Sequence, residues 1–355
     1  MFSFFRANEE NFYNELIKDE LDVKKIKKYI LKGIDLNKKD EKGRTVLFSL
    51  VTKRKVDAIR YLIKFDLDIN SEDNYGKTVL DYCIDKADGM MIRFLLENGA
   101  SINRFNSSNR TALQDAALDG NYKVFEVLMK YKPDFSIYDD KEQHILFDAI
   151  KGENINILKD IVNNLKNLNV LNQNNQTALF DAVLLDNPEL AKCLILNGIN
   201  VNFLDRQGQS ALFNAVILGN KNYEVIELLV KKGIDINIID NDKRSILDEI
   251  LFIINQQANA RSKNGKYKLI KNDYDYREIA KLLMENGLEI DQIHDEKTTL
   301  QACIEQKDLD SSKFLIDCGA DLNHTDLDGK SLLSKELIKG YENYMIIDFL
   351  IENGA

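Results

Sequence analysis

The octapeptide Asp73-Asn-Tyr-Gly-Lys-Thr-Val-Leu80 holds the pattern that decides the fold of this 355-residue chain. Its last part, a Thr, Ser or His followed two residues later by Leu, returns nine times along the sequence. The Leu positions are Leu47, Leu80, Leu113, Leu146, Leu179, Leu212, Leu247, Leu300 and Leu333, so the step is 33 residues except for one of 35 and one of 53. A period of this size predicts a repeat array in which each copy packs on its neighbours.

Each copy carries signals for a hairpin followed by two helices. An Asp or Asn five residues before the Thr, such as Asp73, favours a turn because its side chain bonds to nearby backbone. A Gly two residues before the Thr, such as Gly76, supplies the positive φ of a hairpin tip, and the Thr hydroxyl can cap the next helix. Apolar residues then recur at helical spacing through a first helix and through a second one, which ends at a Gly such as Gly99.

A hairpin, two helices and a return loop in this order closely resemble the ankyrin repeat. The segments Asn98-Gly-Ala-Ser-Ile-Asn103 and Cys318-Gly-Ala-Asp-Leu-Asn323 look like the helix ends of that family. The resemblance covers roughly residues 36–355. It implies an all-α ankyrin-repeat solenoid, curved, with stacked helix-turn-helix copies, short β-hairpin loops and a helical N-terminal cap. The Pro and the His of the family's Thr-Pro-Leu-His core are absent from all nine copies.

We expect residues 1–35 to form the cap, with helices over roughly 9–18 and 23–31, and residues 36–355 to form nine repeats. The repeats start near residues 36, 71, 104, 137, 170, 203, 238, 292 and 324. The 53-residue step predicts an insertion at about 256–275 in the seventh repeat. In the fourth repeat His144 replaces the Thr and Glu142 the Gly, so a distorted hairpin is expected there. At Ala355 the last outer helix has just ended, so we expect that the last repeat tolerates exposure, that another chain packs there, or that the native protein continues.

Composition and charge narrow the classes of function. The net charge is −10, although residues 21–64 hold fourteen Lys/Arg and five Asp/Glu. The acidic remainder argues against nucleic acid, whose affinity comes largely from neutralised phosphates. No apolar run approaches the ~20 residues of a membrane span, and the first ten residues lack a secretory signal. Four widely spaced cysteines favour a reducing compartment. We therefore expect a cytoplasmic monomer. The basic N-terminal face is either a solvated cap or a contact for anionic lipid or an acidic protein.

The resemblance implies that partners bind a concave surface of hairpin tips and first helices. There, aromatic and acidic residues recur three and four positions after the capping residue, and apolar residues follow one helical turn later. The predicted partner-binding residues are Phe147, Asp148, Phe180, Asp181, Leu184, Phe213, Asn214, Ile217, Glu249 and Phe252. An apolar strip bordered by carboxylates suits an amphipathic or basic segment of a partner. In the alternative interpretation the Phe rings pack between repeats and the carboxylates are solvated.

Two further sets of residues have both a binding and a structural interpretation. A basic or amide residue precedes the capping position throughout, which could form a ligand track, although such residues are ordinary there in the family. These residues are Arg44, Lys77, Arg110, Gln143, Gln176, Gln209, Arg244, Lys297 and Lys330. The insertion contributes Lys263, Lys266, Tyr267 and Lys268 as a secondary site for an acidic partner. A mobile, solvated loop is the alternative, because long insertions are either functional or disordered.

Catalysis has almost no support in the sequence. His144, His294 and His324 each lie near a hairpin, without a nucleophile at a recognisable spacing, and no phosphate-binding, hydrolase or metal motif occurs. We expect no enzyme, no cofactor and no metal. The leading hypothesis is a protein-binding scaffold, in which Phe180→Ala with Phe213→Ala weakens partner capture and leaves helicity intact. The alternatives are an inhibitor or immunity-type protein that occludes an enzyme or toxin, and the targeting part of a bacterial effector that acts in the host cytosol.

Overall fold

The computed structural model describes the backbone of residues 7–139, 143–185, 187–263, 276–294, 296–325, 328–340 and 343–355. Within these residues the only β-strands are a short antiparallel pair, β1 (Ile293–His294) and β2 (Lys297–Thr298), and the rest are helices and loops. The expected all-α fold is therefore confirmed. The chain divides into two compact units, Met1–Lys166 and Asn167–Ala355.

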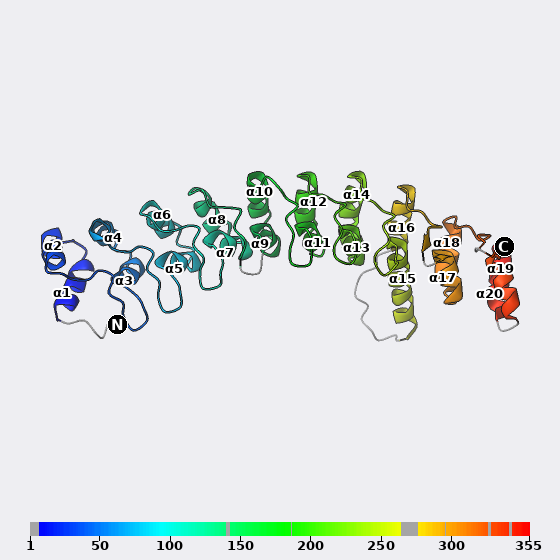
Figure 1. Ribbon diagram of the computed structural model, residues 1–355, viewed down its shortest axis with the longest axis horizontal. Helices are drawn as coiled ribbons and strands as arrows, with labels where there is room; N and C mark the ends of the chain where they lie inside the picture. The colour runs from blue at the N-terminus through cyan, green and yellow to red at the C-terminus, as the bar shows by residue number, and fades with distance from the viewer. Residues whose placement is uncertain are drawn as a thin grey trace. The chain divides into compact units, whose positions relative to one another are not determined.

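In the N-terminal unit the helices pair and follow one another in sequence order (Figure 1). The first helix of each repeat lies in one row, which we call inner, and the second lies in another, which we call outer. The cap helices are α1 (Ala7–Leu16) and α2 (Val23–Leu31). The inner–outer pairs are α3 (Val46–Thr52) with α4 (Val56–Leu62) and the 3-10 turn η1 (Ile63–Phe65), α5 (Val79–Asp85) with α6 (Gly89–Glu97), α7 (Ala112–Leu118) with α8 (Tyr122–Met129), and α9 (Ile145–Lys151) with α10 (Ile155–Asn164).

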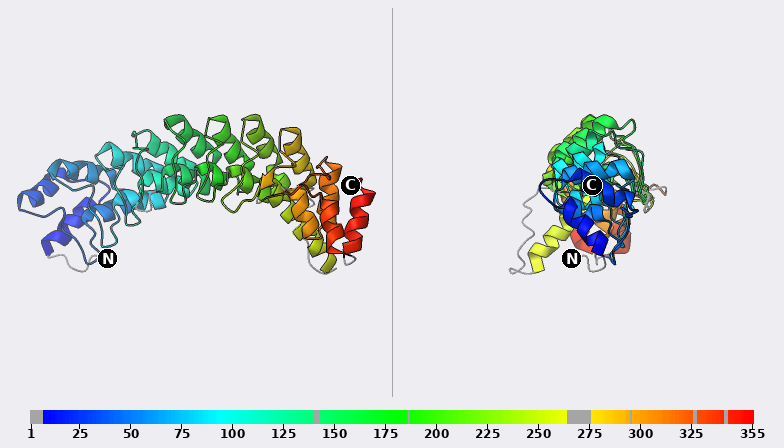
Figure 2. Two further views of the ribbon diagram at one scale, coloured as in Figure 1. Left: turned by 45° about the vertical axis from the view of Figure 1, so that its right-hand side comes forward. Right: turned by 90° about the vertical axis from the view of Figure 1, so that its left-hand side faces the viewer.

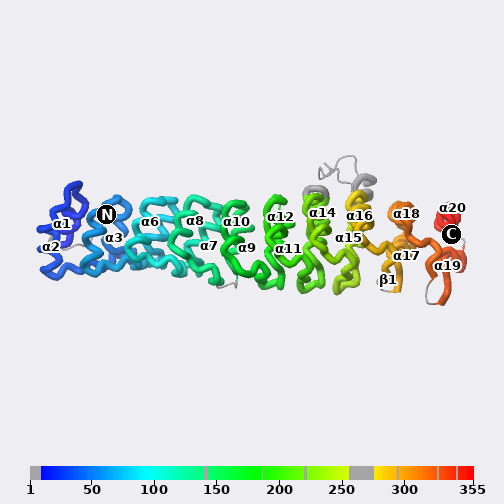
Figure 3. The backbone as a smooth tube through the Cα atoms, turned by 90° about the horizontal axis from the view of Figure 1, so that it is seen from above, coloured from blue at the N-terminus to red at the C-terminus, as the bar shows by residue number. Residues whose placement is uncertain are grey.

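The C-terminal unit repeats this pairing, and the tube in Figure 3 passes through its pairs in order. The pairs are α11 (Ala178–Ala182) with α12 (Pro188–Leu196), α13 (Ala211–Ile217) and the 3-10 turn η2 (Gly219–Asn222) with α14 (Tyr223–Lys231), α15 (Ile246–Lys263) with α16 (Tyr276–Glu285), α17 (Thr299–Glu305) with α18 (Leu309–Asp317), and α19 (Leu332–Lys339) with α20 (Tyr344–Glu352). The longer α15 projects past the neighbouring inner helices of its unit (Figures 1 and 2).

The hairpins are closed by the Asp and Asn side chains that the sequence singles out. The backbone N–H of Asp73 donates to the carbonyl of Lys77 at 2.9 Å, and its Oδ1 accepts the backbone N–H groups of Tyr75 (2.9 Å) and Lys77 (3.1 Å). Seven carboxylate or amide residues close a hairpin in this way: Asp40, Asp73, Asn106, Asp139, Asn172, Asp205 and Asp240. An acceptor positioned for the turn lets short loops form without a sheet.

The fourth repeat keeps this geometry in its described residues. The N–H of Asp139 donates to the carbonyl of Gln143 at 3.1 Å, as in the other repeats, while residues 140–142 lie outside the described residues. His144 replaces the capping hydroxyl, and its Nδ1 accepts the N–H of Leu146 at 3.2 Å. Burial lowers the pKa of His144, so its neutral ring caps the helix in place of Thr.

The inner helices are covered on most of their circumference. In α13, Ala211, Leu212, Phe213, Ala215 and Val216 are all buried. The repeated Leu is buried in the first eight repeats and half-buried at Leu333. Within each unit, α5, α7 and α13 pack on their own outer helix and on the inner helices of both neighbouring repeats. The seventh residue after the capping position therefore faces solvent, and the fourth is half-buried except at the fully buried Asp148.

Asparagines bridge successive repeats next to the helix ends. The Nδ2 of Asn202 donates to the carbonyl of Gly233 at 3.0 Å, and its Oδ1 accepts the N–H of Asp235 at 2.7 Å. The same two bonds join Asn237 to Gly287 and Glu289, both at 2.9 Å, although about twenty additional residues lie between these partners. The predicted insertion thus leaves the contact between its repeat and the next one intact.

Candidate protein-binding surface

One position of the inner helix is open to solvent throughout the chain, namely the seventh residue after the capping residue. This position is exposed in every repeat except the third, where it is half-buried. The residues at this position are Thr52, Asp85, Leu118 and Lys151 in the N-terminal unit and Leu184, Ile217, Phe252, Glu305 and Ile338 in the C-terminal unit. Thr, Asp, Lys and Glu all occur at this position, so the fold does not require an apolar side chain there.

Three consecutive repeats of the C-terminal unit nevertheless place large apolar side chains at this position. Leu184 is 46% exposed, Ile217 48% and Phe252 60%. Ile217 and Phe252 come from α13 and α15, whereas Leu184 lies two residues past the end of α11, and each of these helices packs against the next. We call these three side chains the apolar ladder. Contiguous exposed apolar surface of this kind marks interaction sites in soluble proteins.

The half-buried residues Asp181, Asn214 and Glu249 lie one helical turn before the apolar ladder. The Nδ2 of Asn214 donates to the carbonyl of Phe180 at 3.4 Å, which joins two repeats. Glu249 lies 3.9 Å from the guanidinium of Arg244, at the limit of an ion pair. This border offers carboxylate and amide groups to a partner that contacts the ladder.

The three phenylalanines predicted beside these residues do not belong to the surface. The exposed fractions are 1% for Phe147, 2% for Phe180 and 3% for Phe213, so their rings pack in the core and present no area to a partner. Their position, three residues after the capping residue, lies on the covered side of the inner helix. The expectation that Phe180→Ala with Phe213→Ala leaves helicity intact does not fit this burial, because such truncations open cavities.

Asp148 is likewise internal, although it was predicted as part of an acidic surface. Its side chain is fully buried, and its Oδ1 lies 2.7 Å from the guanidinium of Arg110 and accepts a hydrogen bond from Gln143 Nε2 at 2.8 Å. Burial raises its pKa to about 6, against the opposing effect of Arg110. Arg110 also contacts Asp115 at 3.0 Å and Asp139 at 3.3 Å. This cluster holds repeats together and is not a binding surface.

The residues before the capping positions connect one hairpin to the next. Gln176 Nε2 donates to Asp205 Oδ2 at 3.1 Å, and Gln209 Nε2 donates to Asp240 Oδ2 at 2.7 Å. Arg44 and Arg110 approach the corresponding carboxylates of Asp73 and Asp139. Their side chains are therefore engaged within the fold, as the structural interpretation of this column requires.

The predicted secondary site falls largely outside the described residues. Lys263 ends α15, and nothing is described of its side chain. Lys266, Tyr267 and Lys268 lie in the undescribed segment 264–275. Binding by these four residues stays a prediction.

A concave surface in the N-terminal unit was not among the predicted residues. It lies over α3 and α5 and has lysines and arginines on its rim. The excess of basic residues over 21–64 was the signal for it. The sequence leaves that charge open between a solvated cap and a contact for anionic lipid or an acidic protein, because a linear sequence does not show that residues near 42, 53 and 86 line one groove.

The described residues contain no group of three or more His, Cys, Asp or Glu that could hold a metal ion. Burial raises the pKa values of Cys83 and Cys303 to about 12, which keeps both thiols protonated and unreactive. Where the backbone is described, none of the helices is both long and apolar enough to cross a membrane.

Comparisons with known proteins point to one family. A family model for ankyrin repeats in three copies matches residues 20–106 and 146–240, and a second ankyrin-repeat model matches residues 86–129. A search of curated proteins finds no significant match. Among solved structures, the ankyrin repeat domain of Bcl-3, described as a unique member of the IkappaB protein family, is 19% identical with a TM-score of 0.53, over 59% of this chain and 95% of that domain. The ankyrin repeat domain of human ASB11 is 21% identical with a TM-score of 0.48, over 58% and 91%. At these identities the likeness concerns the fold alone.

Proposed function

Because the chain belongs to the ankyrin-repeat family, we propose that it is a non-catalytic protein-binding scaffold whose C-terminal unit contacts its partner through the apolar ladder. Ankyrin repeats generally mediate protein–protein interaction. The observation that carries the proposal is that Leu184, Ile217 and Phe252 expose about half of their surface at a position where other repeats hold charged residues.

These half-exposed side chains can still gain free energy of burial when a partner covers them. Fully burying a large apolar side chain is worth about 1.5–3 kcal/mol. Because each ladder residue is roughly half exposed, about 1 kcal/mol per residue is left for an interface. Apolar anchors surrounded by polar groups are the usual centre of a protein interface.

The spacing of the ladder favours an amphipathic helix as the contacting segment. Neighbouring packed helices lie about 8–10 Å apart, so successive ladder residues should be separated by a similar distance. Residues seven positions apart on a helix rise by about 10.5 Å. A partner helix with apolar residues in a heptad pattern can therefore meet all three residues, and basic residues beside that stripe can meet Asp181 and Glu249.

We also propose that the protein works in the cytoplasm. The support is that Cys83, Cys193, Cys303 and Cys318 are all free thiols, three of them buried and one half-buried. Disulfides are rare in reducing compartments, and buried free cysteines are ordinary core residues there.

The test uses the full chain, immobilised through a tag, to capture partners from native lysate of the source cells. The double variant Leu184→Glu/Ile217→Glu should lose at least about 90% of the captured partner, because two carboxylates would be buried in an apolar contact. The matched control is Leu196→Glu/Ile351→Glu, which places the same charges at exposed apolar sites on the outer helices α12 and α20.

Both doubles should keep the circular dichroism and unfolding midpoint of the wild type, since all four positions are exposed. A photo-crosslinking amino acid at position 214 should then label the same captured protein. Equal capture by the ladder variant and the wild type would rule out the ladder as the contact surface. The identity of the labelled protein would also separate a scaffold from an inhibitor of one enzyme or toxin.

A further inference from the structure

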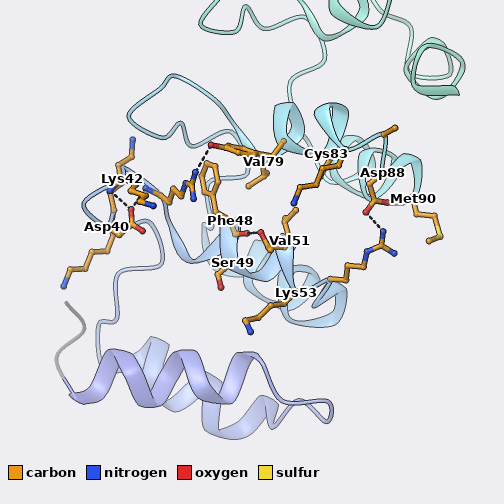
Figure 4. Close-up of a pocket in the computed structure, with 18 of the residues that line it drawn as sticks. Asp40, Lys42, Phe48, Ser49, Val51, Lys53, Val79, Cys83, Asp88 and Met90 are labelled. Atoms are coloured by element: carbon orange, nitrogen blue, oxygen red, sulfur yellow. Dashed lines mark hydrogen bonds and ion pairs between the residues drawn. The ribbon is translucent and has the colours of Figure 1, made fainter. Parts of the chain in front are cut away.

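A groove of about 970 Å³ lies over α3 and α5 in the N-terminal unit (Figure 4). One end is formed by the hairpin that contains Asp40 and Lys42. The other end is formed by the residues that follow the two inner helices, including Lys53, Lys86 and Met90. Figure 4 shows Phe48, Val51 and Val79 between these ends. All residues that line the groove lie within residues 38–90. The groove therefore shares no residue with the apolar ladder.

The rim of the groove carries an excess of positive charge. Seven Lys or Arg and three Asp or Glu line it, and two of those carboxylates are already engaged within the fold. Asp40 Oδ1 accepts the backbone N–H groups of Lys42 and Arg44 at 2.9 and 2.8 Å, and Asp88 pairs with Arg54 at 2.6 Å. Three of the cations are themselves paired, Lys38 with Glu9, Arg44 with Asp73 and Arg54 with Asp88, which leaves four lysines against Asp40 and Glu41.

Three rim lysines are available to a ligand. Lys42, Lys53 and Lys86 are exposed, and in the described part of the chain none of their ammonium groups has a carboxylate partner. Figure 4 shows Lys42 at the hairpin end and Lys53 away from it, and Lys86 lines the groove directly after the end of α5. Arg44 is held differently, because its guanidinium donates to the hydroxyl of Tyr82 at 2.8 Å and that hydroxyl donates to Asp73 at 2.7 Å.

The floor between the two basic ends is apolar. Phe48 and Val51 of α3 face Val79 and Cys83 of α5, and all four residues are at most 9% exposed. The seven residues of α3 span about 10 Å, and the loops at both ends extend this length. At roughly 3.3 Å per residue, about three residues of an extended peptide span the length of α3, and the flanking residues reach the loops at its two ends.

We propose that this groove binds an extended acidic peptide segment of a protein partner, with carboxylates at both ends and an apolar side chain between them. The end carboxylates pair with Lys42 and with Lys53 and Lys86, and the central side chain contacts the exposed edges of Phe48 and Val51. Charge complementarity favours this occupant. Nucleic acid fits less well, because Glu41 and Asp88 interrupt the basic rim and the whole chain carries −10. A flat membrane surface cannot reach the recessed floor.

The test measures direct binding of a defined probe to the full chain by fluorescence anisotropy at 50 mM salt. The probe is a labelled nonapeptide with three glutamates at each end of an Ala-Leu-Ala centre. Three arms use the same peptide with glutamines for glutamates, the same peptide with Asn for the central Leu, and a single-stranded oligonucleotide of equal charge. A fourth arm is co-sedimentation with vesicles containing phosphatidylserine.

Lys42→Glu/Lys53→Glu/Lys86→Glu should weaken binding of the acidic peptide about tenfold or more. The matched control is Lys64→Glu/Lys123→Glu/Lys159→Glu, which makes the same change in net charge at exposed lysines outside the groove and should alter affinity by less than about twofold. The glutamine peptide should not bind, and the Asn-centred peptide should bind several-fold more weakly.

Two results would overturn the proposal. One is an equal loss of affinity in both triple variants, which would mean that the probe senses only overall charge. The other is preferential binding of the oligonucleotide or the vesicles over the acidic peptide. Because these variants leave the ladder residues unchanged, failure here is separate from failure of the proposed function.

Discussion

Phe180 in α11 and Leu184, two residues past the end of that helix, show how a shift of four residues separates core from surface. Phe180 is 2% exposed and Leu184 is 46% exposed. We expect Phe180→Ala to lower the free energy of unfolding by about 3–5 kcal/mol, because it leaves a cavity. Leu184→Ala should change it by less than about 0.5 kcal/mol. Urea unfolding monitored by circular dichroism measures the free energy of unfolding of both variants. Similar losses in the two variants would contradict the assignment of Phe180 to the core and Leu184 to the surface.

At this scale the sequence predicted the exposed residues better than the buried ones. The helical spacing correctly separated Leu184 and Ile217 from the core positions. It wrongly predicted Phe180 and Asp148 to be on the surface, because an amphipathic pattern with one polar face assumes that half of the helix is solvated. An inner helix of a repeat array is covered by its own outer helix and by both neighbours. The third position after the capping residue is buried in six of the nine repeats, and the carboxylate of Asp148, one residue further on, is buried as well.

At the scale of elements, the asparagine bridge between repeats gives a prediction. Asn202→Ala removes the bonds to Gly233 and Asp235, and each neutral hydrogen bond contributes about 0.5–1.5 kcal/mol. We expect the free energy of unfolding to fall by about 1–2 kcal/mol. Asn174→Ala is the matched control, since the side chain of Asn174 is exposed and makes no hydrogen bond that joins described repeats. Its effect should be below about 0.5 kcal/mol. Equal thermal and urea stability of the two variants would show that the bridge is energetically neutral.

The hairpins and paired helices were predictable from local chemistry, because Asx turns, capping residues and terminal glycines act within a few residues of one another. The turn at Asp73 and the helix start at Thr78 illustrate this. The end of α15 was not predictable in the same way. The sequence placed an insertion from about residue 256, whereas the helix continues to Lys263. Helix-forming residues such as Gln256 and Ala258 extend a helix as readily as they precede a loop.

At the scale of the whole molecule, each compact unit carries its own surface, and the two differ in chemistry. The C-terminal unit exposes an apolar ladder bordered by Asp181 and Glu249, whereas the N-terminal unit has a groove with Lys42 and Lys86 on its rim. The excess of Lys and Arg over residues 21–64 supplies most of the cations on the rim of this groove. The convergence of distant loops on the groove depends on how repeats stack, so no linear pattern could have shown it.

Buried carboxylates change the stability of the chain with pH in two opposite directions. At Asp73, burial opposes ionisation, but hydrogen bonds from Tyr82 and from two backbone amides outweigh it and lower the pKa. Asp240 has a lowered pKa for the same reason, with Gln209 as its side-chain donor. These two residues stabilise the fold above the unfolded pKa of about 4, and this stabilisation is lost as pH falls through their folded pKa values.

Asp148 acts in the opposite sense. Its pKa is raised to about 6, so the native state binds the proton more tightly than the unfolded chain does. Stability should therefore increase as pH falls from about 6 to about 4, by at most about 3 kcal/mol for a shift of this size. We expect the wild type to be most stable between about pH 4 and 6. The difference in unfolding free energy between the wild type and Asp148→Asn should grow in favour of the wild type as pH falls from 7.5 to 4. Urea unfolding of both proteins across this range isolates the contribution of Asp148, because Asp73 and Asp240 are common to them. A difference that stays constant, or that falls on acidification, would mean that Arg110 keeps Asp148 ionised and that the cluster is an ordinary buried ion pair.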